Sequence, residues 1–321
     1  MIVIGALAGS YIILSFIFFK YPLLIHKKKN FFQCQHISHR GGAGENYENS
    51  MSAFKHAVNM ETDMLELDCQ ITLDKKVVVY HDSILNTRTE GDGSISDYNY
   101  KDLPLLKEEI PIDFMPGLSF NNNNDNDKDN NRKIPLLEDV FKNFTNIPMN
   151  IDIKINNDNL IHITNTLIKK YNREHITIWG NHTNVISQKC YKENPNICLF
   201  FSTQRVLWTL IQFYTGILPF MPIKETHLEI FMPLVIKDVY NYHFGYKWWH
   251  SIISKIVHVL LIRKCLFKHL LKRGILTYIW VLNTENEFQL AFDVGASGIM
   301  TDYPTKLKKF LLENPQYRRM K

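Results

Sequence analysis

The order of apolar runs along the chain is the feature that most restricts its fold. Short runs rich in β-forming residues alternate with segments of helical spacing over most of the sequence. This alternation is typical of a parallel sheet with crossover helices. Nine strands are predicted, at residues 33–38, 64–70, 77–80, 149–155, 176–179, 197–202, 228–233, 276–282 and 298–301. The predicted helices include residues 48–59, 136–144, 157–171, 182–192, 284–292 and 304–312.

The number of strand–helix units decides between the α/β folds. The run 77–80 follows the second strand closely, so we interpret it as an excursion beside that strand, which leaves eight. Eight units in roughly 290 residues fit one barrel better than two small domains. The sequence therefore predicts an α/β fold, a (β/α)₈ TIM barrel over residues 36–315.

The N-terminus predicts a membrane anchor. Residues 2–19 carry no charge, and as a helix they would reach roughly 27 Å, close to the thickness of a hydrocarbon core. A cleaved signal peptide is the alternative, but no Lys or Arg precedes the run and no convincing cleavage site follows it. Lys27, Lys28 and Lys29 follow the run and place the rest of the chain in the cytosol. We interpret residues 1–25 as a transmembrane signal anchor and residues 26–35 as a basic juxtamembrane linker.

Two further segments interrupt the barrel pattern. Residues 121–133 are a polar, Asn-rich low-complexity stretch, predicted to be a solvated loop without chemistry. Residues 199–223 are long and apolar enough to suggest a second span. Such a span would put the later strands on the opposite side of the membrane from the earlier ones, and the barrel would not close. We therefore expect an apolar segment that lies on the membrane face.

Charge and cysteine content exclude several classes of protein. The net charge of +5 is mild, and no basic stripe with interleaved aromatic residues indicates a nucleic-acid surface. The five cysteines are odd in number and lack CxxC spacing, which argues against a zinc site or a disulfide framework and for a reducing compartment. No protein partner is identifiable.

Two strands carry acidic residues on one face. Glu66 and Asp68 are two positions apart, so both carboxylates lie on the same side of a strand whose other face is apolar. Asp152 and Lys154 repeat the arrangement. Carboxylates inside a barrel need a compensating positive charge, and Mg²⁺ or Ca²⁺ suits carboxylate ligands. Salt bridges to Arg or Lys are the simpler alternative.

Histidines end two of the strands. His39 and His81 follow apolar runs, and Arg40 comes directly after His39, at the barrel end where this fold places its chemistry. The set suggests phosphate-ester chemistry, with the histidines as acid and base and Lys154 on a non-bridging oxygen. No G-x-S-x-G or Cys/His signature indicates a covalent route, and the glycines around residues 41–44 fit neither nucleotide-binding template. We attribute these glycines to a tight turn that lets backbone approach a phosphodiester.

The motifs, taken together, resemble those of the glycerophosphodiester phosphodiesterase family. "HRG", "ENS", "ELD", "HD", "IDIK", "WVLN" and "GIMTDYP" occur in the family's order within residues 36–311. "ISHRGGAGENYEN", "DMLELDC" and "YIWVLN", with the N-terminal anchor, are similar to its membrane-anchored lysophospholipase D subgroup of animals. This resemblance implies an acid/base pair, His39 and His81; metal ligands Glu66, Asp68 and Asp152, with His81 close enough to be a further ligand; substrate contacts Arg40 and Trp280; and support from Glu48 and Asn49.

The resemblance also implies an activity and a cofactor. We expect metal-dependent hydrolysis of lysophospholipids to lysophosphatidic acid and a headgroup alcohol, with Mg²⁺ or Ca²⁺ and Mn²⁺ as a further alternative. In the family, the substrate's own glycerol hydroxyl is thought to attack phosphorus and give a cyclic phosphate. Many relatives have Glu at the position of Asp152, and the shorter Asp side chain would reach the metal through water or shift its position. Hydrolysis of water-soluble glycerophosphodiesters such as glycerophosphocholine is one alternative, and an inactive lipid-binding scaffold is another. The location implied is the endoplasmic reticulum, with the barrel facing the cytosol.

Overall fold

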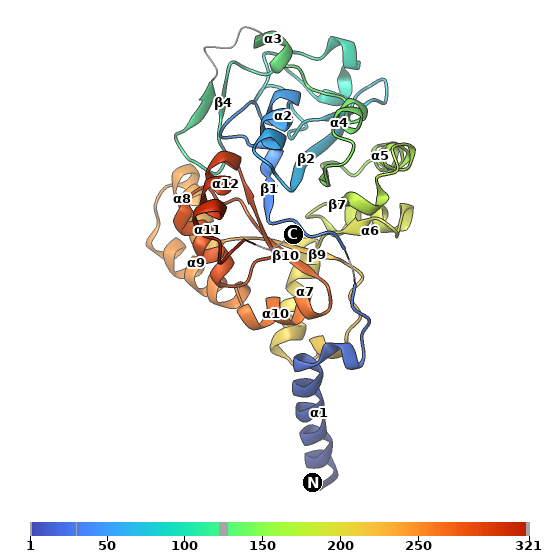
Figure 1. The fold of residues 1–321 in the computed structure, drawn as a ribbon, viewed down its shortest axis with the longest axis vertical. Helices are drawn as coiled ribbons and strands as arrows, with labels where there is room; N and C mark the ends of the chain where they lie inside the picture. The colour runs from blue at the N-terminus through green and yellow to red at the C-terminus, as the bar shows by residue number, and fades with distance from the viewer. Residues whose placement is uncertain (1, 30, 122–127, 319–321) are drawn as a thin grey trace.

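Parallel strands form a nearly closed barrel (Figure 1) in the computed structural model, which describes residues 2–29, 31–121 and 128–318. The spatial order is β8-β7-β6-β2-β1-β11-β10-β9. A parallel bridge from Phe200 to His227 joins the two ends of this order. The predicted TIM-barrel fold is confirmed. The eight strands are β1 His36–Ser38, β2 Met64–Ile71, β6 Met149–Ile153, β7 Thr177–Gly180, β8 Cys198–Leu199, β9 His227–Phe231, β10 Leu276–Trp280 and β11 Gly298–Thr301.

The second strand shows how the sequence pattern sets the two faces of the barrel. Leu65, Leu67 and Cys69 on β2 are fully buried in the core between strands and helices, whereas the alternate residues Glu66 and Asp68 line the internal cavity. β3 (Val77–Val79) pairs antiparallel with β2 outside the eight-strand order. The interpretation of that run as an excursion is therefore correct.

Helices surround the strands, and most of them carry an apolar inner stripe. Ser50 is the N-cap of α2 and its hydroxyl accepts a hydrogen bond from the amide of Ala53. The helix therefore begins at Met51 rather than at residue 48 as predicted, because Asn49 has a φ of 56°, outside the helical region. The helices that correspond to predicted ones are α2 Met51–Asn59, α4 Leu137–Asn143, α5 Asp158–Lys170, α6 Asn184–Glu193, α11 Glu285–Asp293 and α12 Pro304–Glu313.

The sequence analysis predicted no helices between residues 233 and 272. The structure has three there, α8 (Pro233–Phe244), α9 (Trp248–Leu261) and α10 (Lys264–Lys272). On α9, apolar residues cover a face that is exposed, whereas the apolar stripe of most helices in a soluble protein packs against the core. The signal in the sequence was the spacing of Trp249, Ile252, Ile256 and Val259, which is helical.

The Asn-rich stretch differs in part from the prediction. Residues 122–127 lie outside the described chain, but α3 (Lys128–Asn131) is helical. Arg132 is 5% exposed. It donates a hydrogen bond to the carbonyl of Leu106 at 2.9 Å and pairs with Glu90. The prediction of a wholly solvated loop is therefore wrong at this end, since a buried guanidinium ties the segment to the irregular stretch that contains Glu90 and Leu106.

The N-terminal helix α1 (Ile2–Lys20) projects from the barrel (Figure 1). Among the described residues it is the one helix long and apolar enough to cross a membrane, with a mean hydropathy of 1.9 over Val3–Lys20 and none of that stretch buried. The apolar segment 199–223 contains α7 (Thr203–Tyr214) and a 3₁₀ turn, Leu218–Phe220. α7 follows β8 as one of the barrel's outer helices.

Candidate active site

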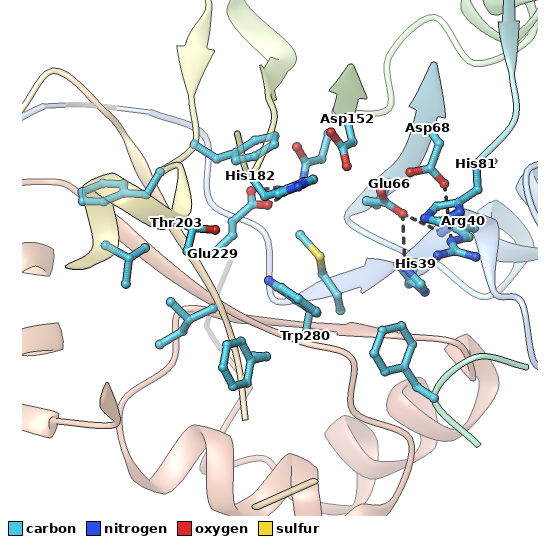
Figure 2. Close-up of a pocket in the computed structure, with 18 of the residues that line it drawn as sticks. His39, Arg40, Glu66, Asp68, His81, Asp152, His182, Thr203, Glu229 and Trp280 are labelled. Carbon is cyan, nitrogen blue, oxygen red and sulfur yellow. Dashed lines mark hydrogen bonds and ion pairs between the residues drawn. The ribbon is translucent and has the colours of Figure 1, made fainter. Parts of the chain in front are cut away.

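A cavity of about 280 Å³ opens at the carboxyl ends of the strands (Figure 2). His39, Glu66, Asp68 and Lys154 gather on a polar side, and the side around Trp280 is largely apolar; Glu229, His182 and Thr203 also line the cavity. The predicted residues His39, Arg40, Glu66, Asp68, His81, Asp152, Lys154 and Trp280 all line it. Glu48 and Asn49 lie behind it as partners of Arg40 and Asp68.

His39 lies directly after β1 and is held from behind by Asp302. Its Nδ1 is 2.7 Å from Oδ1 of Asp302, and Asn283 donates to Oδ2 of the same carboxylate at 2.9 Å. Burial alone would lower the pKa of His39, but the charge and hydrogen bond of Asp302 outweigh burial, so the net shift is upward. This arrangement fixes the ring and leaves Nε2, 4.0 Å from Oε2 of Glu66, toward the cavity.

The sequence analysis missed the role of Asp302. The "TDYP" segment would also suit a helix N-cap followed by proline. Pro304 does begin α12, but the N-cap is Tyr303 and makes no side-chain capping bond. The carboxylate of Asp302 is turned toward His39 instead, and the signal that could have found it was an acidic residue at the end of the last barrel strand.

Glu66 and Asp68 have different surroundings. Oε2 of Glu66 accepts the backbone N–H of Arg40 at 2.7 Å, and burial together with the charge of Asp68 raises the pKa of Glu66. Asp68 is also buried, which would raise its pKa, but Lys154, His81 and Arg40 lower it more. Asn49 donates to Oδ2 of Asp68 at 2.8 Å. Asp68 therefore stays ionised, while Glu66 lacks comparable compensation.

Asp152 lies beside Asp68 on the neighbouring strand. The two residues are register partners between β6 and β2, and like charges placed in this way repel each other. Nζ of Lys154 lies 2.9 Å from Asp152 and 3.3 Å from Asp68 and relieves this repulsion. Burial would lower the pKa of Lys154, but the two carboxylates raise it, so it remains charged. Asn181 donates to the other oxygen of Asp152 at 2.8 Å.

Arg40 has more carboxylate partners than predicted. It is 4% exposed, and its NH1 lies 3.1 Å from Glu48 and 3.0 Å from Asp113. Arg88, which the sequence analysis did not single out, pairs with the same two carboxylates. Arg40 lines the cavity from within this network, and its predicted contact with phosphate stays a prediction.

His81 is more exposed than His39 and also has an aspartate partner. Its Nδ1 lies 2.6 Å from Oδ1 of Asp82, the next residue in the chain. Asp82 is itself held by Arg88 through Nε at 3.2 Å. The two histidines therefore have the same arrangement: a carboxylate binds Nδ1 of the ring, and Nε2 remains available for another partner.

The carboxylates suit a divalent cation by chemistry more than by their present arrangement. Within the described residues, no group of three or more His, Cys, Asp or Glu side chains is arranged to hold a metal ion. Glu66, Asp68 and Asp152 offer the hard oxygen ligands that such a cation prefers, and Glu66 is short of positive charge. Lys154 now bridges Asp68 and Asp152, as the simpler salt-bridge interpretation predicted. The three carboxylates therefore fit a divalent cation if the ammonium group of Lys154 moves away from Asp68 and Asp152.

Glu229 is a cavity residue that the sequence analysis missed. It lies on β9, and the amide of Asn150 donates to both of its carboxylate oxygens at 3.0 and 3.1 Å. Burial, with Glu66 and Asp152 nearby, raises the pKa of Glu229 well above its usual value. Glu229 therefore faces the cavity in surroundings that favour its protonated form. An acidic residue alternating with apolar ones in "HLEIF" was the available signal.

The apolar side of the cavity is built around Trp280 at the end of β10. Its ring meets those of Phe114 and Phe231 edge-on, with centroids 6.2 and 6.0 Å apart. Val206 from the start of α7 and Leu261 from the end of α9 complete this wall. Trp280 thus lines the cavity, and its predicted contact with the substrate stays a prediction.

The glycines near His39 serve packing inside the protein. A Cβ atom at Gly41 would come within 2.8 Å of the Phe54 ring, and one at Gly42 within 2.8 Å of Pro304. Both glycines have positive φ, 79° and 102°. The turn was predicted, but what approaches it closely is α2 and the start of α12.

Comparison with known proteins identifies the family. The model of the glycerophosphoryl diester phosphodiesterase family matches residues 39–306. Over 304 residues, the chain is 51% identical to Lysophospholipase D GDPD1 and 38% identical to Lysophospholipase D GDPD3, both of Homo sapiens. Each match covers 94% of this chain, and 94% and 93% of those proteins respectively.

Solved structures show the same fold at low sequence identity. A glycerophosphoryl diester phosphodiesterase domain from Mycobacterium tuberculosis superposes with a TM-score of 0.60 at 13% identity, covering 87% of this chain and 99% of that one. A phosphodiesterase from Oleispira antarctica, in complex with sn-glycerol-3-phosphate, gives 0.55 at 17% identity, with 87% and 97% covered. On the family match and the close relatives, this chain belongs to the glycerophosphoryl diester phosphodiesterase family.

Proposed function

We propose that the protein hydrolyses lysophospholipids at the bond between phosphate and headgroup, leaving lysophosphatidic acid and a headgroup alcohol. The observation that carries this proposal is the division of the cavity into a polar and an apolar side. Acid–base residues and carboxylates lie on the first, and Trp280 and its phenylalanine neighbours lie on the second. A glycerophosphodiester that still carries an acyl chain has the matching chemistry. The names of the relatives, Lysophospholipase D, support the same substrate class.

The two histidines would move protons on either side of phosphorus. Asp302 and Asp82 hold Nδ1 of His39 and His81, so Nε2 of each ring is the atom that exchanges a proton. One histidine takes the proton of the attacking hydroxyl while the other donates one to the leaving oxygen. If the substrate's glycerol hydroxyl attacks first, the two exchange roles when water opens the cyclic phosphate.

Glu66, Asp68 and Asp152 are proposed to hold a divalent cation, with Mg²⁺, Ca²⁺ and Mn²⁺ as candidates. His81 could join these ligands only through Nε2 and in place of its proton transfer, because Asp82 holds Nδ1. When bound, the cation would supply positive charge to the phosphoryl oxygens. Lys154 would then turn from the carboxylates toward a non-bridging oxygen, since its ammonium lies beside both acids. Arg40 contributes positive charge to the phosphate from its carboxylate network, and Glu48 and Asn49 keep Arg40 and Asp68 in place.

Membrane attachment through α1 is part of the proposal. Its apolar length and the lysines that follow support a single anchor over residues 1–25 with the barrel on the cytosolic side. The endoplasmic reticulum is the membrane we propose.

The runner-up substrate is a water-soluble glycerophosphodiester, which the polar side of the cavity would also hold. Purified protein can be given lysophosphatidylcholine and glycerophosphocholine at equal concentration, each with Mg²⁺, Ca²⁺ or Mn²⁺, and headgroup release measured by mass spectrometry. The proposal predicts a higher kcat/KM for the acylated substrate. Faster turnover of the deacylated one would favour the runner-up, and no release with any metal would refute both.

A further inference from the structure

Two hydrogen bonds join the anchor helix α1 to the C-terminal end of α7, well before the end of α1. The hydroxyl of Tyr11 donates to the carbonyl of Thr215 and that of Ser15 to the carbonyl of Gly216, both at 2.6 Å. The ring of Phe220 stacks on Tyr11. Tyr11 and Ser15 lie nine and five residues before Lys20, the end of α1. At about 1.5 Å per residue, these contacts lie roughly 13 Å and 8 Å from that end.

If α1 crosses the bilayer, the end of α7 therefore lies in it as well. Backbone carbonyls at a helix C-terminus are left unpaired by the helix, and in hydrocarbon each must find a partner. The Tyr11 and Ser15 hydroxyls supply those partners for Thr215 and Gly216. Residues 212–221 contain no charged side chain, which suits the same location.

A wider exposed apolar surface continues from this point. On α7, Leu207, Trp208 and Ile211 are 58%, 52% and 43% exposed, and their spacing puts them on one side of the helix. The hydroxyl of Tyr214 donates to the carbonyl of Leu260 at 2.8 Å and so links α7 to α9. In Figure 1, α9 runs down toward α10 and α7 on the part of the barrel from which α1 projects.

α9 turns its most apolar side to the exterior. Ile252, Ile253, Ile256 and Val259 are between 48% and 57% exposed. Counted from Trp249, the three isoleucines follow the i, i+3, i+4, i+7 pattern that soluble proteins point inward. Trp248 and Trp249 begin the same helix, 68% and 42% exposed. An apolar stripe of this kind on the outside marks an interaction surface.

The charge around this surface has one sign. Between Asp238 and Glu285 the sequence has no acidic residue, whereas six exposed or half-exposed basic residues occur there: Lys247, Lys255, Arg263, Lys264, Lys268 and Lys272. Nζ of Lys272 donates to the carbonyl of Lys20 at 2.7 Å, so the basic end of α10 lies beside the end of α1. Basic residues at that level attract anionic lipid headgroups.

We propose that the outer sides of α7 and α9, with the turn at residues 215–220, form one docking face for the bilayer that holds α1. The inner sides of the same helices line the cavity through Val206 and Leu261. A lysophospholipid can then pass from the leaflet into the cavity between them without crossing water. The passage of lysophospholipid rests on the proposed function. The docking of this face on the bilayer does not, because it requires no catalytic activity.

Tryptophan fluorescence tests the docking directly. Three of the five tryptophans, Trp208, Trp248 and Trp249, lie on the face, while Trp179 and Trp280 lie within the barrel. The full chain is reconstituted in vesicles of phosphatidylcholine and phosphatidylserine, with or without acyl-chain bromine. We expect bromine to remove roughly half of the emission, and the triple variant W208F/W248F/W249F to lose this sensitivity. Emission that bromine leaves unchanged and that aqueous iodide quenches would overturn the proposal, whether or not the protein has activity.

A kinetic comparison tests the passage of substrate. Ile253→Glu with Ile256→Glu places charge on the face, and Val185→Glu on α6, 53% exposed, is the matched control. The double variant should lose tenfold or more in rate on lysophospholipid in vesicles and keep its rate on glycerophosphocholine. Equal rates on vesicles for the double variant and the control would show that α9 does not serve substrate access.

Discussion

Replacing Asp302 by Asn tests how the structure sets the state of His39. The carboxylate makes a 2.7 Å bond to Nδ1 of His39, and both side chains are buried. A hydrogen bond to a charged group contributes about 2 kcal/mol, which corresponds to roughly 30-fold in the ionisation equilibrium of the ring.

The neighbouring Asn283 makes the effect larger than the lost charge alone. Its amide donates to Oδ2 of Asp302 at 2.9 Å, so in the Asn variant the carbonyl oxygen stays on that side. The new NH₂ group then faces Nδ1 of His39 and forces the ring proton onto Nε2. A wrong tautomer in a comparable carboxylate–histidine pair lowers kcat by about 10⁴-fold. We therefore expect a loss between about 30-fold and 10⁴-fold.

The assay is kcat/KM against pH, measured for the wild type, Asp302→Asn and Asp139→Asn. Asp139 on α4 is exposed and distant from the cavity, so its variant should match the wild type. Asp302 raises the pKa of His39. Its removal lowers that pKa, so the limb of the profile that reports His39 should move to lower pH: the acidic limb if His39 acts as the base, the basic limb if it acts as the acid. An Asp302→Asn variant with full activity and an unmoved limb would refute the reasoning.

Three further outcomes follow from the same geometry. Removal of divalent ions with a chelator should abolish hydrolysis, and Mg²⁺, Ca²⁺ or Mn²⁺ should restore it; activity that survives exhaustive chelation would contradict the role of Glu66, Asp68 and Asp152. Because burial raises the pKa of Glu229 and favours its protonated form, Glu229→Gln should keep kcat/KM within about twofold at pH 7. Glu229→Ala leaves the Asn150 amide unpaired and should melt earlier. A tenfold loss of kcat/KM in the Gln variant would mean that the ionised form acts. Ile151→Ala, at a fully buried position, should lower the free energy of unfolding by about 3 kcal/mol in urea titrations, while Val185→Ala on the surface should change it by less than about 0.5 kcal/mol.

Local patterns were enough for much of the fold and for the side chains at strand ends. The alternation of Leu65, Leu67 and Cys69 with Glu66 and Asp68 identifies both faces of β2 without reference to the rest of the chain. The strand ends of a parallel barrel meet at one rim, so residues that end different strands are brought together by topology alone.

Partners that come from distant loops could not be predicted in this way. Asp302 lies 263 residues from His39, and Asp113 meets Arg40 from an irregular segment that has no periodicity to read. The helices between residues 233 and 272 were missed for another reason. α9 carries its apolar stripe on the outside. A prediction that assumes apolar faces pack against the core therefore does not assign this helix a position on the barrel.

Phosphorus NMR of lysophosphatidylcholine turnover is the most direct test of the site and its substrate. The full chain in vesicles with a divalent ion should convert the phosphodiester signal to the monoester signal of lysophosphatidic acid, with choline released in equal amount. His39→Ala should fold as the wild type does by circular dichroism and give no conversion. Release of fatty acid with the phosphodiester intact, or conversion at the wild-type rate by His39→Ala, would contradict the account.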